Sequence, residues 1–245
     1  MMYELLAHVY DALVKDDEAT ACWVELIKAH IRGTELLELA CGSGEITIAL
    51  AQEGYHVDAS DLSAAMIEEA KKKDGSEQVS WSVMDMCDLH TDKSYDGILC
   101  LCDSFNYLLK DEQVRALFQG AYRHLRDNGV FLVDMHSMDR LEEFAEEYNE
   151  AGHVKDLEYQ WTIASEDDRI YQNFAFYDSE GRVTLEQHEQ RVYEPAWILA
   201  ELKNAGFQVE VYTDFTQAGI CEGEKQFYIC RKAGGIQYCS DCSNG

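Results

Sequence analysis

The chain has little positive charge and no long apolar run. Its 245 residues contain 20 lysines and arginines against 47 aspartates and glutamates, which gives a formal net charge of −27. Phosphate backbones are bound mainly through clustered basic side chains, and no basic run here is longer than Lys71-Lys72-Lys73. No apolar stretch approaches the roughly 20 residues that a membrane-spanning helix needs. We therefore expect neither a nucleic-acid ligand nor a membrane span.

The sequence also lacks the charged, apolar and small-residue segments of a secretion signal at its start. Its nine cysteines are an odd number and are scattered along the chain, so we expect reduced thiols in a cytoplasmic protein. Cys239 and Cys242 form one C-x-x-C pair, with no second pair and no paired histidines after it. A zinc site needs about four ligands, and we therefore predict no metal site.

What the chain does have is a glycine turn between a short apolar strand and a helix, over residues 35–51. Gly42 and Gly44 allow the backbone to turn tightly and to approach a ligand, because they carry no Cβ. Such a unit places backbone N–H groups and a helix N-terminus at the carboxyl edge of a parallel sheet. A tight turn without a ligand is the alternative. The dinucleotide fingerprint Gly-x-Gly-x-x-Gly does not fit, because its third glycine would fall on Thr47.

This turn resembles motif I of the class I S-adenosylmethionine (SAM)-dependent methyltransferases. The motif is an acidic residue, one further residue and then Gly-x-Gly-x-Gly; Glu38, Gly42 and Gly44 match it, and Ala40 replaces the first glycine. The resemblance continues over residues 35–136. It implies a Rossmann-like α/β fold, with a seven-stranded, mostly parallel sheet flanked by helices. It also implies SAM as the cofactor.

An acid at the end of the second predicted strand, residues 55–61, is the expected ribose ligand. Asp61 lies 19 positions after Gly42, close to the roughly 20-residue interval for an acid that binds a pair of ribose hydroxyls. A carboxylate suits this role because it accepts two hydrogen bonds. Asp58 is the competing acid, but it lies inside the strand, where a solvated face would explain it.

Two further motifs extend the resemblance. Leu62, Ser63 and Met66 follow the ribose acid as in the second motif of the family, and Ser63 is suited to cap the next helix. In the family, the acid that corresponds to Asp85 contacts the adenine amino group, and its neighbour, here Met86, reads the ring. The alternative for Asp85 is an acid that caps the following turn.

The nonpolar strand predicted over residues 95–102 suits the centre of a parallel sheet. Residues 103–107 follow it and resemble motif IV, which lines the space between the sulfonium and the methyl acceptor. Asp103 and His136 stand at carboxyl ends of strands and are the candidate general bases, although either could instead bind SAM or cap the next helix. The cofactor-binding residues that the resemblance implies are Tyr10, Glu38, Ala40, Gly42, Asp61, Leu62, Met66, Asp85, Met86 and Cys102.

Helices are predicted over residues 3–31, before the glycine turn. The resemblance implies that they form a lid, in which Tyr10 and Trp23 would close over the cofactor or the substrate. The alternative is that these helices are packed for stability.

Residues 138–194 depart from a minimal methyltransferase. We predict an acidic helix over residues 138–149 and then three antiparallel strands. From Asp139 to Glu194 there are 16 acidic and 5 basic residues. Glycine N-methyltransferase and a group of uncharacterised bacterial methyltransferases resemble this plan, with a β-rich cap over the acceptor site. The alternative is that the sheet is a dimer surface or an element that adds stability.

The predicted domains are therefore a SAM-binding core and a cap. Residues 1–137 and 195–232 form the core, residues 138–194 form the β-rich insert, and residues 233–245 form a flexible tail. The core closes with a helix that begins at Pro195 and an antiparallel hairpin.

The expected reaction is the in-line transfer of a methyl group from SAM to a small-molecule acceptor, for which the main task is to hold donor and acceptor in line. The acidic insert would attract a cationic amine. A protein or RNA methyltransferase that works with a partner, a non-catalytic SAM-binding protein and a nicotinamide-dependent oxidoreductase are the alternatives. An exposed insert is also compatible with a homodimer.

Overall fold

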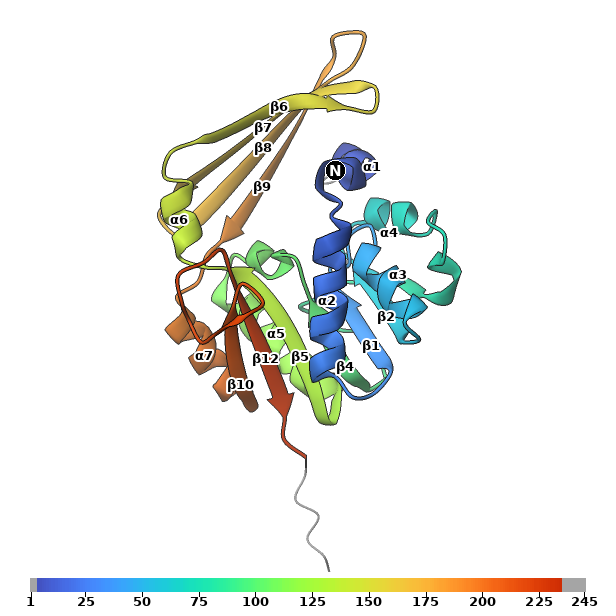
Figure 1. The fold of residues 1–245 in the computed structure, drawn as a ribbon, viewed down its shortest axis with the longest axis vertical. Helices are drawn as coiled ribbons and strands as arrows, with labels where there is room; N and C mark the ends of the chain where they lie inside the picture. The colour runs from blue at the N-terminus through green and yellow to red at the C-terminus, as the bar shows by residue number, and fades with distance from the viewer. Residues whose placement is uncertain (1–3, 235–245) are drawn as a thin grey trace, which may run out of the picture.

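The computed structural model describes residues 4–234 and contains two β-sheets (Figure 1). The larger sheet has eight strands in the order β11-β10-β12-β5-β4-β1-β2-β3, and the smaller one has the order β6-β7-β8-β9. The Cys239/Cys242 pair and most of the predicted tail lie outside the described residues.

Parallel strands form the centre of the larger sheet. They are β1 (Glu35–Leu39), β2 (His56–Asp61), β3 (Ser80–Val83), β4 (Tyr95–Cys100) and β5 (Leu125–His136). The antiparallel strands β12 (Lys225–Lys232), β10 (Phe207–Thr213) and β11 (Gln217–Ala218) continue it. The expected Rossmann-like fold is confirmed. The sheet has eight strands where seven were expected, because it also contains the two-residue strand β11.

Helices cover both faces of this sheet, because the central strands are apolar on both sides. Leu36 of β1 packs in one core with α2 (Asp17–His30) and α3 (Glu45–Gln52). Leu37, its neighbour in the strand, packs in the other core with α5 (Asp111–His124) and α7 (Pro195–Asn204). Successive side chains of a strand point to opposite faces, so this double burial fixes β1 at the centre of the molecule.

Most of the remaining elements lie at the carboxyl edge of the parallel strands. The smaller sheet consists of β6 (Tyr148–Val154), β7 (Leu157–Glu166), β8 (Arg169–Tyr177) and β9 (Val183–Arg191), all antiparallel. Short helices at this edge are α4 (Ala64–Ala70), α6 (Asp139–Glu143) and η2 (Ser104–Tyr107), whereas η1 (Ser76–Gln78) directly precedes β3 at the opposite edge. Figure 1 shows α1 (Glu4–Val14) between the smaller sheet and helices α3 and α4.

The predicted acidic helix over residues 138–149 is wrong for most of its length. Helix α6 has five residues, and Tyr148 already begins β6, which pairs with β7 from Tyr148↔Ile163 to Val154↔Leu157. Strand β6 lies at the edge of its sheet and is largely exposed. It therefore shows little of the apolar alternation that marks a half-buried strand. The three predicted strands correspond to β7, β8 and β9.

A second difference concerns the end of α5. The sequence predicts a helix to about Arg126 and a turn at residues 127–129, whereas α5 ends at His124 and β5 begins at Leu125. The register between β4 and β5 shifts at Tyr95/Gly97, so the extra residues form an irregularity at the start of β5. The division into core, insert and tail stays a prediction. Among the helices of residues 4–234, none is long and apolar enough to cross a membrane.

Candidate active site

The predicted site residues come together where β1, β2, β4 and β5 end, at the edge of the larger sheet that faces the smaller sheet (Figure 1). In parallel sheets of this kind, ligands bind outside the carboxyl ends of the strands. The glycine turn after β1 and the loop after β4 supply most of the polar groups at this edge.

The glycine turn leaves open space beside Gly42. Ala40, Gly42 and Gly44 have φ values of 52°, 55° and 80°, in the left-handed region that favours glycine. A Cβ built on Gly42 would meet nothing within 4 Å, whereas one on Gly44 would come within 2.5 Å of Trp81. Gly44 is therefore required by packing, while Gly42 leaves room for a ligand. Ala40 holds the strained conformation of the missing first glycine.

Glu38 lies beneath this turn and is buried. The Thr47 hydroxyl of α3 donates a hydrogen bond to Glu38 Oε2 at 2.6 Å. This bond joins the end of strand β1 to the helix that follows it. Burial raises the pKa of Glu38 to about 7, even though the bond from Thr47 favours the ionised form.

Asp61 closes the turn from the neighbouring strand. Its Oδ2 accepts a hydrogen bond from Gly42 N–H at 2.9 Å, and its Oδ1 accepts one from Ser63 N–H at 2.8 Å. Burial raises the pKa of Asp61, against these two backbone donors. Each carboxylate oxygen has a second lone pair, so Asp61 is oriented by the backbone and still able to accept from a ligand.

The other residues of the second and third motifs differ in exposure. Leu62 is 69% exposed, and Met66 is buried within α4, where its N–H bonds the Ser63 hydroxyl at 3.3 Å. The exposed Asp85 carboxylate accepts a hydrogen bond from Cys87 N–H at 2.8 Å, as the alternative interpretation expects of a turn cap. Met86 is half-buried, and its sulfur lies 3.9 Å from the sulfur of Cys100.

Helix α1 reaches the same edge through two consecutive residues. The Ser43 hydroxyl donates to Asp11 Oδ1 at 2.5 Å, which ties α1 to the glycine turn. Burial raises the pKa of the Tyr10 hydroxyl, and nearby groups of the loop after β4 raise it further. Trp23, by contrast, is buried in the core against Phe215 and Phe227, so the alternative of packing for stability holds for this residue.

The loop after β4 contains the most strained backbone of the site. Cys102 and Asp103 are consecutive non-glycine residues with φ values of 56° and 59°. Residues in such conformations cost of order 1–3 kcal/mol each and persist where the surroundings hold them. The side chain of Cys102 is exposed at this edge.

Three elements that are distant in sequence hold Asp103. The Asp103 N–H donates to Asp134 Oδ2 of β5 at 3.2 Å. Its carboxylate oxygen Oδ2 accepts from Lys225 Nζ of β12 at 3.0 Å, and its carbonyl accepts from Gln190 Nε2 of β9 at 3.3 Å. Asp103 is thus fixed at its N–H, its side chain and its C=O.

Nearby charges and burial give Asp103 and its neighbour Asp134 different pKa values. Burial opposes the ionisation of Asp103, but Lys225 and then His136 outweigh it and hold the pKa of Asp103 below its ordinary value. Asp134 is fully buried, and burial raises its pKa to about 7, although Lys225 Nζ lies 3.4 Å from its Oδ2. Asp103 is therefore the charged carboxylate of the pair at neutral pH.

His136 ends β5 beside Asp103 and is 5% exposed. Its Nδ1 lies 3.6 Å from Asp103 Oδ1, and its Nε2 lies 3.2 Å from Gln190 Oε1. Burial lowers the pKa of His136 in spite of the opposing effect of Asp103. A neutral imidazole next to a carboxylate is an arrangement that can accept a proton.

The sequence did not indicate three residues of this arrangement. Asp134, Lys225 and Gln190 are 31, 122 and 87 positions from Asp103. Only Asp134 had a local signal, since it stands near the end of a predicted strand. No motif marks Lys225 or Gln190.

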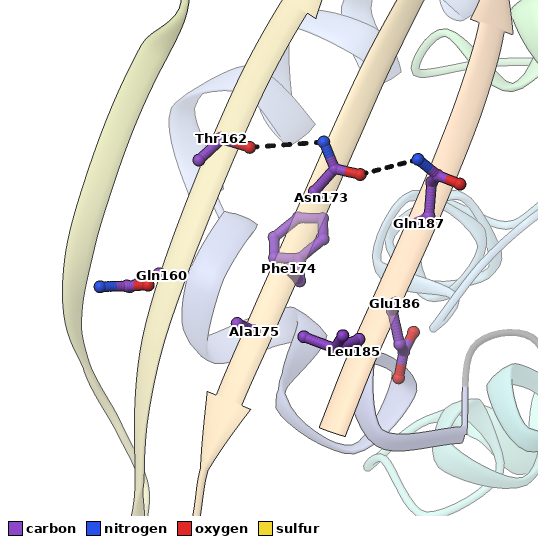
Figure 2. A pocket seen from close by; sticks show the side chains of 8 residues that line it. All are labelled: Gln160, Thr162, Asn173, Phe174, Ala175, Leu185, Glu186 and Gln187. Carbon is purple, nitrogen blue, oxygen red and sulfur yellow. Dashed lines mark hydrogen bonds between the residues drawn. The ribbon is translucent and has the colours of Figure 1, made fainter. Parts of the chain in front are cut away.

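A hollow of about 360 Å³ lies away from this edge, on the outer face of the smaller sheet (Figure 2). Side chains from β7, β8 and β9 line it, and a short ladder of hydrogen bonds runs from Thr162 through Asn173 to Gln187. None of the predicted site residues belongs to its lining. Within residues 4–234 there is also no group of three or more metal-binding side chains.

Comparison with known proteins agrees with this geometry. Residues 36–129 match the methyltransferase domain family. The chain is 32% identical over 243 residues to YqeM of Bacillus subtilis (strain 168), which is assigned as a methyltransferase; the match covers 95% of this chain and 98% of that protein. The chain belongs to the methyltransferases.

Two further comparisons refine this methyltransferase assignment. A glycine/sarcosine N-methyltransferase of Parasynechococcus marenigrum (strain WH8102) is 30% identical over 126 residues, which is 49% of this chain and 43% of that protein. A SAM-dependent methyltransferase from Clostridium acetobutylicum ATCC 824 has a similar structure, with a TM-score of 0.80 and 26% identity over 95% of this chain and 99% of that one. The methyltransferase is therefore an enzyme that uses SAM, as its sequence motifs imply.

Proposed function

We propose that this SAM-dependent methyltransferase acts on a small-molecule acceptor and binds SAM at the glycine turn. The observation that carries the proposal is the open space beside Gly42, which a Cβ would enter without contact, directly next to the Asp61 carboxylate. A backbone without Cβ and an adjacent carboxylate suit a ligand that carries a ribose.

The predicted cofactor residues have separate tasks in this proposal. Asp61 accepts from the ribose hydroxyls, while Asp85 and Met86 lie toward the adenine. Glu38 supports the turn from below, and Tyr10 covers it from α1. The remaining residues of the predicted set surround these positions and are Ala40, Gly42, Leu62, Met66 and Cys102.

Methyl transfer from SAM requires little or no acid catalysis. SAM supplies an activated methyl group, and its leaving group is a neutral thioether. The protein has to hold the acceptor about 3–3.5 Å from the methyl carbon and in line with the breaking bond. It also has to take up a proton from the acceptor, for which Asp103 and His136 are the proposed groups.

A small acceptor is favoured by what covers this edge. The inner face of the smaller sheet contributes Gln190, which contacts both Asp103 and His136. Val9 of α1 packs with Phe174 and Phe176 of β8, so α1 and the smaller sheet share a core. The net charge of −27 disfavours an RNA acceptor. A cytoplasmic location and a homodimer stay predictions.

The test is to incubate the purified protein with radiolabelled SAM and a library of small-molecule nucleophiles. Asp103→Asn and His136→Gln serve as matched variants. Transfer that the wild type performs and the two variants lose, while SAM binding is retained, supports the proposal. Tight SAM binding without transfer to any acceptor class would favour the non-catalytic alternative.

A further inference from the structure

Gln190 connects the smaller sheet to both proposed catalytic groups. It lies on β9, is 3% exposed and donates from Nε2 to the carbonyl of Asp103 at 3.3 Å. Its Oε1 lies 3.2 Å from His136 Nε2 and accepts from Gln172 Nε2 at 2.9 Å. One buried amide thus contacts the loop after β4, the end of β5 and the neighbouring strand β8.

The partners of the Gln190 side chain determine which of its two terminal atoms is nitrogen and which is oxygen. A backbone carbonyl can only accept a hydrogen bond, so the Gln190 atom next to the Asp103 carbonyl has to be the NH₂ group. The oxygen of Gln190 therefore faces His136. An oxygen can only accept, which places the proton of a neutral His136 on Nε2 and leaves a lone pair on Nδ1.

Two acceptors then face each other between His136 and Asp103. The lone pair of Nδ1 lies 3.6 Å from Asp103 Oδ1. Neither atom has a hydrogen-bond partner among residues 4–234, and both are buried. Two neighbouring acceptors without a proton between them are costly to leave unpaired, and a ligand with two N–H donors at one atom would satisfy both.

From this arrangement we propose that the methyl acceptor is a primary amine, and that Gln190 is the positioning residue that selects it. This inference rests on the proposed function. A primary amine directs two N–H bonds to Asp103 Oδ1 and His136 Nδ1 and keeps one lone pair for the methyl carbon. A hydroxyl has one hydrogen and a secondary amine has one N–H, so each leaves one of the two acceptors unpaired.

The transfer step balances within this arrangement. The amine nitrogen uses its lone pair to form the bond to the methyl carbon, and the electron pair of the carbon–sulfur bond stays on sulfur. One N–H proton of the resulting ammonium passes to Nδ1 of His136. An amine that is a cation in solution loses one proton to solvent before it binds, so that the bound nitrogen keeps its lone pair.

The surrounding charges suit a ligand that is bound as a neutral amine. Asp103 and Asp134 face Lys225 of β12, and Arg140 of α6 adds a more distant positive charge. Tyr10 of α1 and Cys102 of the loop after β4 complete the titratable groups around the pair. With Asp134 protonated, the charges of Asp103 and Lys225 cancel, so this group leaves no net negative charge to hold an ammonium, and a neutral amine fits it better.

The first experiment measures the tautomer of His136 in the free protein, by NMR with ¹⁵N-labelled histidine and His136→Asn for assignment. We expect a neutral ring with the proton on Nε2 at pH 8. Gln190→Leu is expected to give a mixture of tautomers, and Gln190→Glu to retain the Nε2 proton. Gln187→Leu, on the outer face of the same strand (Figure 2), is the matched control and should change nothing. A proton on Nδ1 in the wild type would overturn the inference.

The second experiment tests the ligand class on protein saturated with S-adenosylhomocysteine. We expect methylammonium chloride to shift the His136 Nδ1 resonance saturably. Gln190→Leu should weaken this response roughly two- to fivefold, because only the fraction of His136 that keeps a lone pair on Nδ1 can bind the amine. Tetramethylammonium has the same charge and no N–H, and methanol has a single donor; neither should reproduce the response. An equal response to tetramethylammonium would overturn the inference. Failure of S-adenosylhomocysteine to bind in calorimetry would instead contradict the proposed function.

Discussion

Lys225 Nζ lies 3.0 Å from Oδ2 of Asp103, although the two residues are 122 positions apart. This ion pair joins the closing hairpin of the core to the strained loop after β4. The same ammonium lies 3.4 Å from Asp134 Oδ2, and Asp134 holds the N–H of Asp103. Strand β12 therefore helps to set both the position and the charge of a proposed catalytic carboxylate.

Removal of the ammonium should change the pH dependence of catalysis. Lys225 holds the pKa of Asp103 below its ordinary value against the effect of burial. In Lys225→Met this pKa rises, so less Asp103 is ionised at a given acidic pH. We expect the acid limb of the kcat/KM profile to move to higher pH. Lys225→Arg should restore it in part, and Lys93→Met, which removes an exposed ion pair with Asp58, should leave it unmoved. An unshifted profile in Lys225→Met would show that the ion pair is only structural.

Alanine substitutions at the two glycines of the turn should differ in their main effect, which is on stability for Gly44 and on SAM binding for Gly42. In Gly44→Ala the new Cβ comes within 2.5 Å of Trp81 at a φ of 80°. The left-handed backbone and the clash together should cost roughly 2–5 kcal/mol of stability. In Gly42→Ala the Cβ meets nothing, so stability should fall only by the roughly 1–2 kcal/mol that a Cβ costs in the left-handed region. SAM affinity should nevertheless drop sharply, because the Cβ occupies ligand space.

Thermal unfolding and SAM titration of these two variants together provide the test. A Gly42→Ala protein that binds SAM as the wild type does would mean that the open space beside Gly42 is not the cofactor site.

Glu38 should make the free protein less stable as the pH rises. Its pKa is about 7 in the folded state, against 4.5 ordinarily. Between these values the unfolded chain has released the proton that the folded chain keeps, so unfolding becomes easier with rising pH. Glu38→Gln keeps an oxygen for Thr47 and removes the titration. We expect the variant to gain up to about 3 kcal/mol over wild type between pH 4.5 and 7, at about 1.4 kcal/mol per pKa unit.

Denaturant unfolding without SAM, at several pH values, measures this difference. A constant difference between Glu38→Gln and wild type across the range would show that Glu38 is already ionised in the folded protein.

The bond between Asp11 and Ser43 should hold α1 over the glycine turn. Asp11 Oδ1 accepts from the Ser43 hydroxyl, and its Oδ2 lies 2.6 Å from Lys73 Nζ. In Asp11→Ala we expect faster amide hydrogen exchange across α1 and SAM dissociation that is roughly five- to tenfold faster, the effect of about one lost hydrogen bond. Glu18→Ala, exposed on α2, is the control. Unchanged exchange in α1 would argue that the smaller sheet alone holds this helix.

The residues that sequence patterns could place are those that interact locally. The glycine turn, Ser63 as a helix cap and the double burial of β1 depend on neighbours a few positions away or on a simple alternation. Strand β6 was missed because an exposed edge strand carries little of that alternation. Trp23 was ambiguous because an aromatic residue on a helix suits a core as well as a site.

The positions of Lys225 and Gln190 could not be predicted in the same way. Each reaches Asp103 only because of where its strand lies. Lys225 begins β12 and pairs with His136, at the carboxyl edge of the parallel strands. Gln190 lies near the end of β9, in the smaller sheet. Such register depends on packing along the whole strand. A lysine or a glutamine within a strand therefore has no local signal for this role.

The most direct test of the account is calorimetric titration of the wild type, Asp61→Ala and Asp58→Ala with SAM and S-adenosylhomocysteine. We expect the wild type to bind both compounds. Asp61→Ala should lose roughly tenfold to a hundredfold in affinity, the cost of about 1.5–3 kcal/mol for a charged hydrogen-bond acceptor. Asp58→Ala, on the same strand, should bind as the wild type does. Equal binding by Asp61→Ala and the wild type would contradict the placement of the cofactor at the glycine turn.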